Sequence, residues 1–307
     1  MPLILPKTED ELSAALLKGV TEGAVVMLDP ATRVKLTRTI SLPSNGWGVP
    51  WGVDGNYAQI TWAGPGGHDM IVYNGTQGSN RCLVVKNLHL DGGGYASAPC
   101  GACLKLSAPK NDGAIYKFTL RDVYTSFGTN GILLEGAVYE GLMDNCHAEN
   151  HRADGILTRH LDEGSSDQKV VSNIQMIHPN SSRNFGAGIN CTYSTNVLMG
   201  SFINNGAGGV VAHNGLRCAI MNNGENTGES VFVVPHNGFG SVIAFNEGST
   251  DMKTVCRKYE GGQWVDVGKP QKYLLEKGDG VAETCNHVST YGGATSPPVA
   301  VVKPAGK

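Results

Sequence analysis

Acidic, basic and imidazole side chains crowd one short segment of the chain. Residues 151–163 read HRADGILTRHLDE, the densest charged stretch of the Asn-rich part of the sequence. An arginine there can bind a carboxylate through two parallel hydrogen bonds, and a histidine titrates near neutral pH. Nearby carboxylates can serve as a paired acid and base. The segment therefore predicts acid–base chemistry, with Arg152, Asp154, Arg159 and His160 as candidate residues.

Three recurring fragments predict the fold that positions these residues. Each joins a short apolar strand to Asn or Gly turns, at irregular periods of about 20–30 residues, which is typical of stacked strand coils. Such coils share one long core, because a single coil cannot bury its apolar side. The fragments are residues 131–133 and 155–157, 24 positions apart; 210–215 and 233–238, 23 apart; and 203–206 and 221–224, 18 apart. The Asn residues expected to stack as amide ladders inside a corner are those at 145, 173, 204, 222 and 246.

Alternation along each strand assigns side chains to the core or to the outer wall. With Ile156 inward, Arg159 points outward, and Glu135 points outward one coil earlier. The same alternation places His213 outward, and the 23-residue repeat places His236 beside it. The column predicted on one wall consists of Glu135, Arg159, His160, Asn190, Tyr193, His213, Asn214, His236 and Asn237.

Several of these residues also have plain structural interpretations. Arg159 can be ion-paired with Glu135, and Asp154, which precedes a glycine, can be an ordinary turn residue. His213 and His236 can be held in Asn/Gly corners by stacking and backbone hydrogen bonds. Both interpretations stay open from the sequence alone.

Composition and charge exclude some classes of partner. The chain has 307 residues, with 24 basic and 27 acidic side chains and a net charge of −3, so nucleic acid is not an expected partner. No apolar run approaches the roughly 20 residues of a membrane span, and residues 1–10 do not resemble a secretory signal. Acidic residues are too scattered to define a calcium cage, so no cofactor is assigned and calcium stays open.

The eight cysteines do not resemble a disulfide framework. Cys100 and Cys103 form a lone C-x-x-C without a second ligand pair, which argues against zinc. Free thiols are expected for all eight, and pairing of Cys256 with Cys285 stays open for an exported protein.

Both ends of the chain differ from its middle. Thr8 and Glu11 form a capping box that begins a short amphipathic helix, which Gly19 is expected to end. This helix would cover the first coil. Residues 1–250 are thus predicted to form a coiled domain with a helical cap, and residues 251–307 a C-terminal cap or oligomerisation tail.

Two motifs carry a family resemblance. The segments TRTISLP at residues 37–43 and KNLHLDG at residues 86–92, with the Gly-Ile-Leu coils, resemble the pectate-lyase-like superfamily. That superfamily includes secreted pectinases and the receptor-cleaving tailspikes of bacteriophages. The resemblance covers about residues 8–248 and implies an all-β, single-stranded, right-handed parallel β-helix. Its members cleave polysaccharides by lyase or hydrolase chemistry, epimerise them, or only bind them.

Three functions follow as hypotheses. The leading one is cleavage of an acidic, uronate-containing polysaccharide by β-elimination, with Arg159, His160, Tyr193 and His213 as the site and Arg152 as a substrate ligand. The second is glycoside hydrolysis by Asp154 with Asp162, Glu163 or Glu135 as the other carboxylate. The third is a non-catalytic receptor-binding or structural virion protein, assembled as a homotrimer through its tail. An extracellular or virion-associated location is expected.

Overall fold

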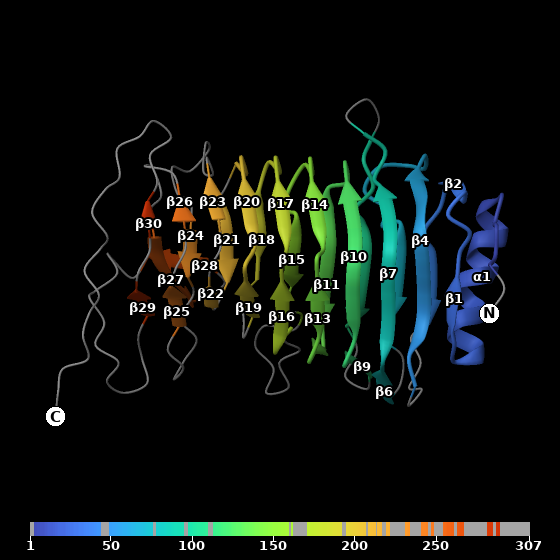
Figure 1. The fold of residues 1–307 in the computed structure, drawn as a ribbon, viewed down its shortest axis with the longest axis horizontal. Helices are drawn as coiled ribbons and strands as arrows, with labels where there is room; N and C mark the ends of the chain where they lie inside the picture. Colours follow the sequence, from blue (N-terminus) through green and yellow to red (C-terminus); the bar gives the residue numbers. More distant parts are fainter. Residues whose placement is uncertain are drawn as a thin grey trace.

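The computed structural model describes residues 3–43, 49–75, 78–94, 98–109, 113–159, 161, 171–191 and 195–206, and further along the chain the strands between residues 208 and 288. Helix α1 (Glu9–Glu22) stands at one end of a row of stacked coils (Figure 1). All strand pairings described are parallel except one hairpin, β27–β28. The chain is therefore a parallel β-helix, in agreement with its resemblance to that superfamily.

The described strands form three sheets. The largest holds 17 strands: β1 (Val25–Met27), β2 (Arg33–Leu36), β4 (Trp51–Trp62), β7 (Leu83–Asp91), β10 (Thr119–Ser126), β13 (Leu142–Asp144), β14 (His147–Glu149), β16 (Ile174–Ile177), β17 (Asn180–Ser182), β19 (Thr195–Leu198), β20 (Ser201–Ile203), β22 (Asn214–Leu216), β23 (Ala219–Met221), β25 (Ser241–Ala244), β26 (Glu247–Gly248), β29 (Val281–Thr284) and β30 (His287–Val288). The second holds 10 strands: β3 (Ile40–Pro43), β5 (Ile71–Asn74), β8 (Ala102–Ala108), β11 (Asn130–Gly136), β15 (Ile156–Arg159), β18 (Ala187–Asn190), β21 (Gly208–Ala212), β24 (Val231–Val233), β27 (Thr254–Glu260) and β28 (Gln263–Asp266). The third holds three: β6 (Gly78–Arg81), β9 (Gly113–Tyr116) and β12 (Val138–Tyr139).

Residues with positive φ make the corners of the coil. They recur every five residues within one coil, at Lys117, Asp122 and Phe127, with φ of 56°, 52° and 57°. The next two coils repeat the spacing at Glu140, Asn145 and Asn150, and at Asn173, His178 and Arg183. The left-handed conformation turns the chain sharply and costs least for Gly, Asn and Asp. Strand β10 of one coil pairs with both β13 and β14 of the next coil, and these pair in turn with β16 and β17 of the coil after it.

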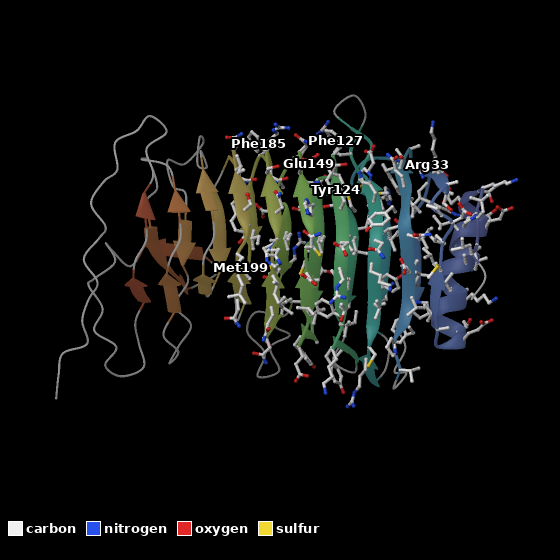
Figure 2. The ribbon with its side chains drawn as sticks, in the orientation of Figure 1. Arg33, Tyr124, Phe127, Glu149, Phe185 and Met199 are labelled. Carbon is white, nitrogen blue, oxygen red and sulfur yellow. The ribbon has the colours of Figure 1, made fainter. Side chains whose placement is uncertain are left out.

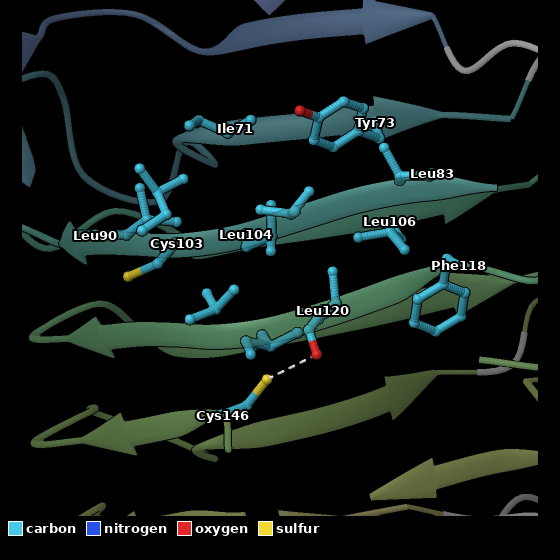
Figure 3. Close-up of a cluster of buried hydrophobic side chains, with 14 of the residues drawn as sticks. Ile71, Tyr73, Leu83, Leu90, Cys103, Leu104, Leu106, Phe118, Leu120 and Cys146 are labelled. Atoms are coloured by element: carbon cyan, nitrogen blue, oxygen red, sulfur yellow. Dashed lines mark hydrogen bonds between the residues drawn. The ribbon is translucent and has the colours of Figure 1, made fainter. Parts of the chain in front are cut away.

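Aliphatic side chains from the two larger sheets fill the space between them (Figure 3). Leu104, Ile132, Ile156 and Ile189 occupy one register position of the 10-stranded sheet, and each is fully buried. Facing them, Leu120, Met143, Met176 and Val197 occupy one position of the 17-stranded sheet. Truncating such a side chain to Ala typically costs about 2–5 kcal/mol, so these columns carry much of the stability.

Helix α1 packs on the first coil through Leu12, Leu16 and Val20, and contacts β1, β2, β3 and β4. Thr8 is its N-cap, as the sequence indicates, and accepts a hydrogen bond from the Glu11 N–H. The expected end at Gly19 is wrong, because the helix continues to Glu22 and Gly23 caps it with φ of 64°. Gly19 serves close packing instead: a Cβ there would lie 2.5 Å from the carbonyl oxygen of Gly52.

The strand registers test the three sequence repeats. Ile132 pairs with Ile156 and Ile203 with Met221, so the repeats of 24 and 18 residues are confirmed. The repeat of 23 residues is wrong as a register, because Val210 pairs with Val231 rather than with Val233. The coil is two residues shorter than the sequence similarity suggests. The placement of His236 beside His213 stays a prediction. Both histidines lie outside the described residues.

The described strands continue past residue 250. Strand β27 pairs with β24, while β29 and β30 pair with β25 and β26. The boundary at residue 250 and the tail stay predictions. No helix in the described part of the chain is long and apolar enough to cross a membrane.

Among the described residues, no disulfide is formed by the cysteines Cys82, Cys100, Cys103, Cys146 and Cys191. Burial raises the pKa of the Cys146 thiol to about 12, so it packs as a neutral apolar group. The sulfurs of Cys100 and Cys103 lie 3.7 Å apart and are fully buried. Among the described residues, no group of three or more His, Cys, Asp and Glu side chains is arranged to hold a metal ion.

Buried polar side chains form a ladder inside one corner. The Asn184 side chain accepts the His151 N–H at 3.0 Å, and the Asn205 side chain accepts the Asn184 N–H at 3.1 Å. His151 Nδ1 accepts the Gly128 N–H at 3.1 Å, which leaves the ring proton on Nε2, 3.2 Å from Thr125 Oγ1. The expected ladder residues are different: Asn145, Asn173 and Asn204 are exposed corner residues with positive φ, and Asn222 and Asn246 lie outside the described part.

The buried ladder predicts a specific dependence of stability on pH. Burial lowers the pKa of His151 to about 4, whereas an unfolded histidine titrates near 6.5. The full stability is therefore present above about pH 6.5 and falls as the pH drops toward 4, by about 3 kcal/mol from this residue. His151→Asn keeps an acceptor at the position and removes the titration. Urea unfolding at pH 7, 5.5 and 4 should show a smaller loss for the variant than for the wild type; parallel losses would contradict the assignment.

Candidate functional site

The wall predicted from the sequence is the outer face of the 10-stranded sheet, and charged pairs occupy it. Glu135 pairs in register with Arg159, and their side chains form an ion pair at 3.2 Å. Lys105 binds the other Glu135 oxygen at 2.9 Å and Asp69 at 3.5 Å, and the Ser107 hydroxyl donates to Glu135. Glu135 is 7% exposed, so its charge is held among two cations and a hydroxyl. The structural interpretation of Arg159 as an ion-pair partner of Glu135 is thus confirmed.

Asp154 is bound into a corner before β15. Its Oδ1 accepts the Ala187 N–H at 2.7 Å, and its Oδ2 accepts the Asn190 amide at 3.0 Å. Burial raises the pKa of Asp154, while these two hydrogen bonds oppose the rise. Asp69 repeats the arrangement, because its Oδ1 accepts the Ala102 N–H at 2.8 Å. A corner Asp that binds the next coil is therefore a recurring structural device, and it occupies both oxygens of Asp154.

The structure brings the predicted residues together in two separate pairs. Glu135 with Arg159 and Asp154 with Asn190 lie toward opposite ends of β15, with about 16 Å of strand between Asp154 and Arg159. Asn214 lies in β22 of the other sheet, where it pairs with Asn196 of β19, and so does not belong to the predicted wall. Arg152 is exposed on the corner before Asp154. The predicted residues outside the described part are His160, Asp162, Glu163, Tyr193, His213, His236 and Asn237.

A second polar column lies on the outer face of the 17-stranded sheet. Its register runs through Gln59, His89, Tyr124, His147 and Asn180 in successive coils. Two residues further along each strand, a parallel column runs through Thr61, Asp91, Ser126, Glu149 and Ser182. Both columns point outward, because the alternate residues Leu88, Val123, Thr125 and Ala148 are buried.

Tyr124 connects the two columns. Its ring stands edge to face with His89, with centroids 4.4 Å apart, and lies 6.0 Å from the ring of His147. Its hydroxyl donates a hydrogen bond to the Glu149 carboxylate, which comes from the next coil (Figure 2). Asp91 accepts the Gly93 N–H at 3.0 Å. The column therefore holds two carboxylates, a phenol and two imidazoles over three adjacent coils.

Both imidazoles are neutral at neutral pH. Burial lowers the pKa of His89, opposed by Asp91 and reinforced by Arg33. Burial also lowers the pKa of His147, opposed by Asp122. His89 Nε2 is buried and makes no hydrogen bond with any described residue. The two rings thus supply proton acceptors and stacking surfaces, and no positive charge, beside Tyr124.

The sequence holds a signal for this column that the prediction did not use. His89 and Asp91 are the outward residues of the motif KNLHLDG, between the buried Leu88 and Leu90. The alternation that places Arg159 outward also places Tyr124, His147 and Glu149 outward on their strands. The prediction instead followed the charged segment 151–163, which leads to the 10-stranded sheet.

No protein-family model matches the chain, and no curated protein matches it. Among solved structures, the chain is similar to the A-module of the Azotobacter vinelandii mannuronan C-5 epimerase AlgE4, with a TM-score of 0.46, 14% identity, and coverage of 97% of this chain and 98% of that one. It is also similar to the enzymatically active domain of bacteriophage CBA120 tailspike protein 2, with a TM-score of 0.47, 11% identity, and coverage of 90% and 44%. These likenesses are distant, so the assignments below rest on the contacts within this chain.

The charge network on the predicted wall predicts different losses of stability for Glu135 and Arg159 variants. Glu135→Gln should lower the free energy of unfolding by about 2–4 kcal/mol, because it leaves the partly buried Lys105 with Asp69 as its remaining partner. Arg159→Gln should cost less than about 1 kcal/mol, because its side chain is half exposed and Lys105 still neutralises Glu135. Urea unfolding of the two variants checks the order, and equal losses would contradict it.

Proposed function

We propose that the protein degrades a polysaccharide by hydrolysis, with Asp91 and Glu149 as the catalytic carboxylates. One observation carries this proposal: the two carboxylates occupy the same outward column, separated by a single coil at Ser126. The sequence motifs that resemble the pectate-lyase-like superfamily, whose members act on polysaccharides, also favour it. The carboxylate pair expected around Asp154 is less suited, because both Asp154 oxygens already accept hydrogen bonds.

The spacing of the coils favours an inverting reaction. Adjacent strands lie about 4.8 Å apart, so the Asp91 and Glu149 backbones are about 10 Å apart across Ser126. Inverting glycosidases hold their carboxyl groups about 6.5–9.5 Å apart, which leaves room for the attacking water. Retaining enzymes need about 5 Å, which is the spacing of directly adjacent coils. Ser126, the residue between the two carboxylates, is small and 2% exposed.

The roles follow from the hydrogen bonds. Tyr124 donates to Glu149, which holds this carboxylate as an acceptor and suits it to be the base. Glu149 takes a proton from water as the water oxygen bonds to the anomeric carbon. The bond from that carbon to the leaving oxygen breaks, and Asp91 gives this oxygen a proton. Such proton transfers typically contribute about 10²–10⁴-fold each.

β-Elimination is the second candidate, and one observation favours it. Tyr124 and the neutral His147 are proton-transfer groups on the same wall, with the exposed Arg152 on the adjacent corner. Elimination through Arg159, His160, Tyr193 and His213 also stays a proposal. Of these four, only Arg159 is described, and its guanidinium is paired with Glu135.

Activity assays of single variants test the proposal. Asp91→Asn and Glu149→Gln should each lower the release of reducing ends by at least about 100-fold, and Tyr124→Phe by less. Asp122→Asn is a matched control, because it also converts an outer carboxylate of this sheet region, at a corner where the neighbouring coils carry Asn87 and Asn145. Its activity should equal that of the wild type.

The products separate the candidates. Inverted reducing ends without unsaturation support hydrolysis, whereas the ultraviolet absorbance of an unsaturated uronate would show elimination. Polysaccharide binding by the wild type without any product would favour a non-catalytic receptor-binding protein and overturn the proposed hydrolysis.

A further inference from the structure

A ridge of aromatic and basic side chains borders the two columns. It comprises Phe127, Arg152, Arg183 and Phe185, which lie on the corner between the 17-stranded and 10-stranded sheets in three successive coils. We call these four residues the corner ridge. Figure 2 shows Phe127 and Phe185 at the upper edge of the coils, just above Tyr124 and Glu149.

Backbone contacts place the corner ridge beside the proposed catalytic pair. Glu149 pairs with Ser182, so the corner residues Asn150 and Arg183 follow side by side on adjacent coils. The Phe185 N–H donates to the His151 carbonyl at 2.9 Å, which sets Phe185 beside Arg152. One coil spacing of about 4.8 Å therefore separates Arg183 and Phe185 from the coil of Glu149.

The ridge is solvent-facing but rigidly supported. Phe185 is 70% exposed, and both arginines are exposed. Directly beneath them, His151 and Asn184 are each 2% exposed and belong to the buried hydrogen-bonded ladder. An exposed aromatic ring on a fixed backbone gives a sugar a flat apolar surface. Because the fold already orders this backbone, ligand binding loses less conformational entropy.

The charges of the column and the ridge are opposite. Glu149 acts as an ionised base in the proposed reaction, so a sugar carboxylate placed directly beside it would be repelled. The guanidinium groups of Arg152 and Arg183 suit a carboxylate, which arginine can bind through two parallel hydrogen bonds. An anionic polymer can therefore lie with its scissile bond over the column and a neighbouring carboxylate on the ridge.

We propose that the corner ridge is the subsite that selects a uronate-containing polysaccharide, with Arg183 and Arg152 binding the carboxylate and Phe185 stacking on the sugar ring. This inference rests on the proposed function, because it takes Asp91 and Glu149 as the place of cleavage.

The conformation of Arg183 allows a sharp test. Arg183 has φ of 56°, and the neighbouring coils carry Asn150 and Asn204 at the same corner position. Asn tolerates positive φ better than Arg does, so Arg183→Asn should fold at least as stably as the wild type. Lys117→Asn is the matched control, because Lys117 is an exposed cation with φ of 56° at a different corner.

Binding is measured in the Glu149→Gln background, by calorimetry, with polygalacturonate, alginate and hyaluronate and with carboxyl-reduced forms of each. For a polymer that binds, adding Arg183→Asn should weaken affinity about 10-fold or more, and adding Lys117→Asn should not. Neither should change affinity for the reduced polymer. Adding Phe185→Ala should weaken binding of both forms, because stacking does not need the carboxylate.

Each outcome decides the proposal. Equal affinities of the Arg183→Asn and Lys117→Asn variants, or no binding to any of the three acidic polymers, would overturn the uronate subsite. Wild-type binding that depends on Arg183 but yields no cleavage would support the subsite and refute the proposed hydrolysis. Cleavage that is indifferent to Arg183 would support hydrolysis and refute the subsite.

Discussion

The five-residue spacing of the left-handed corners sets the geometry of the whole stack. In the coil that holds β10, the buried residues Phe118, Leu120, Val123 and Thr125 follow one another at intervals of two, three and two. The interval of three contains the corner residue Asp122, whose positive φ absorbs the extra position. Alternation therefore restarts in phase after each corner. Without that reset, the outward columns of successive segments would not stay on one wall.

Corners also leave buried backbone N–H groups that need hydrogen-bond acceptors. Where the chain turns, a backbone N–H can lose its strand partner, and a buried unpaired N–H costs about 1–3 kcal/mol. His151, Asn184 and Asn205 meet this demand by accepting backbone N–H groups of the preceding coil. The same contacts immobilise the backbone of the corner ridge. The hydrogen bonds that satisfy the buried backbone N–H groups thus also hold the backbone of the corner ridge in place.

The sequence predicts those features of the fold that depend on short repeats and on alternation within one strand. Alternation and the Gly-Ile-Leu repeat predict the parallel coils, the outward direction of Arg159 and its pairing with Glu135, all of which the registers confirm. The sequence was insufficient where coil length changes. The repeat at Val233 suggests 23 residues, yet the register is 21, because Val233 pairs with Ala212. Turn residues that resemble one another do not have to occupy equivalent positions. Similarly, Asn214 follows the corner onto the other sheet, which no periodicity in its own strand reveals.

Charge balance explains why the two walls differ in what they can do. On the 10-stranded sheet, Asp69, Lys105, Glu135 and Arg159 alternate in sign, and each carboxylate meets a cation within 4 Å. Such charges already have partners, so a ligand gains little by replacing them. On the 17-stranded sheet, Asp91 and Glu149 have no cationic partner among the described residues and are held by an N–H and a phenol. A hydrogen bond orients a carboxylate but, unlike an ion pair, brings no opposite charge to it. Among the described residues, the lack of a cation beside Asp91 and Glu149 is the difference from the 10-stranded sheet on which the proposed role of this column rests.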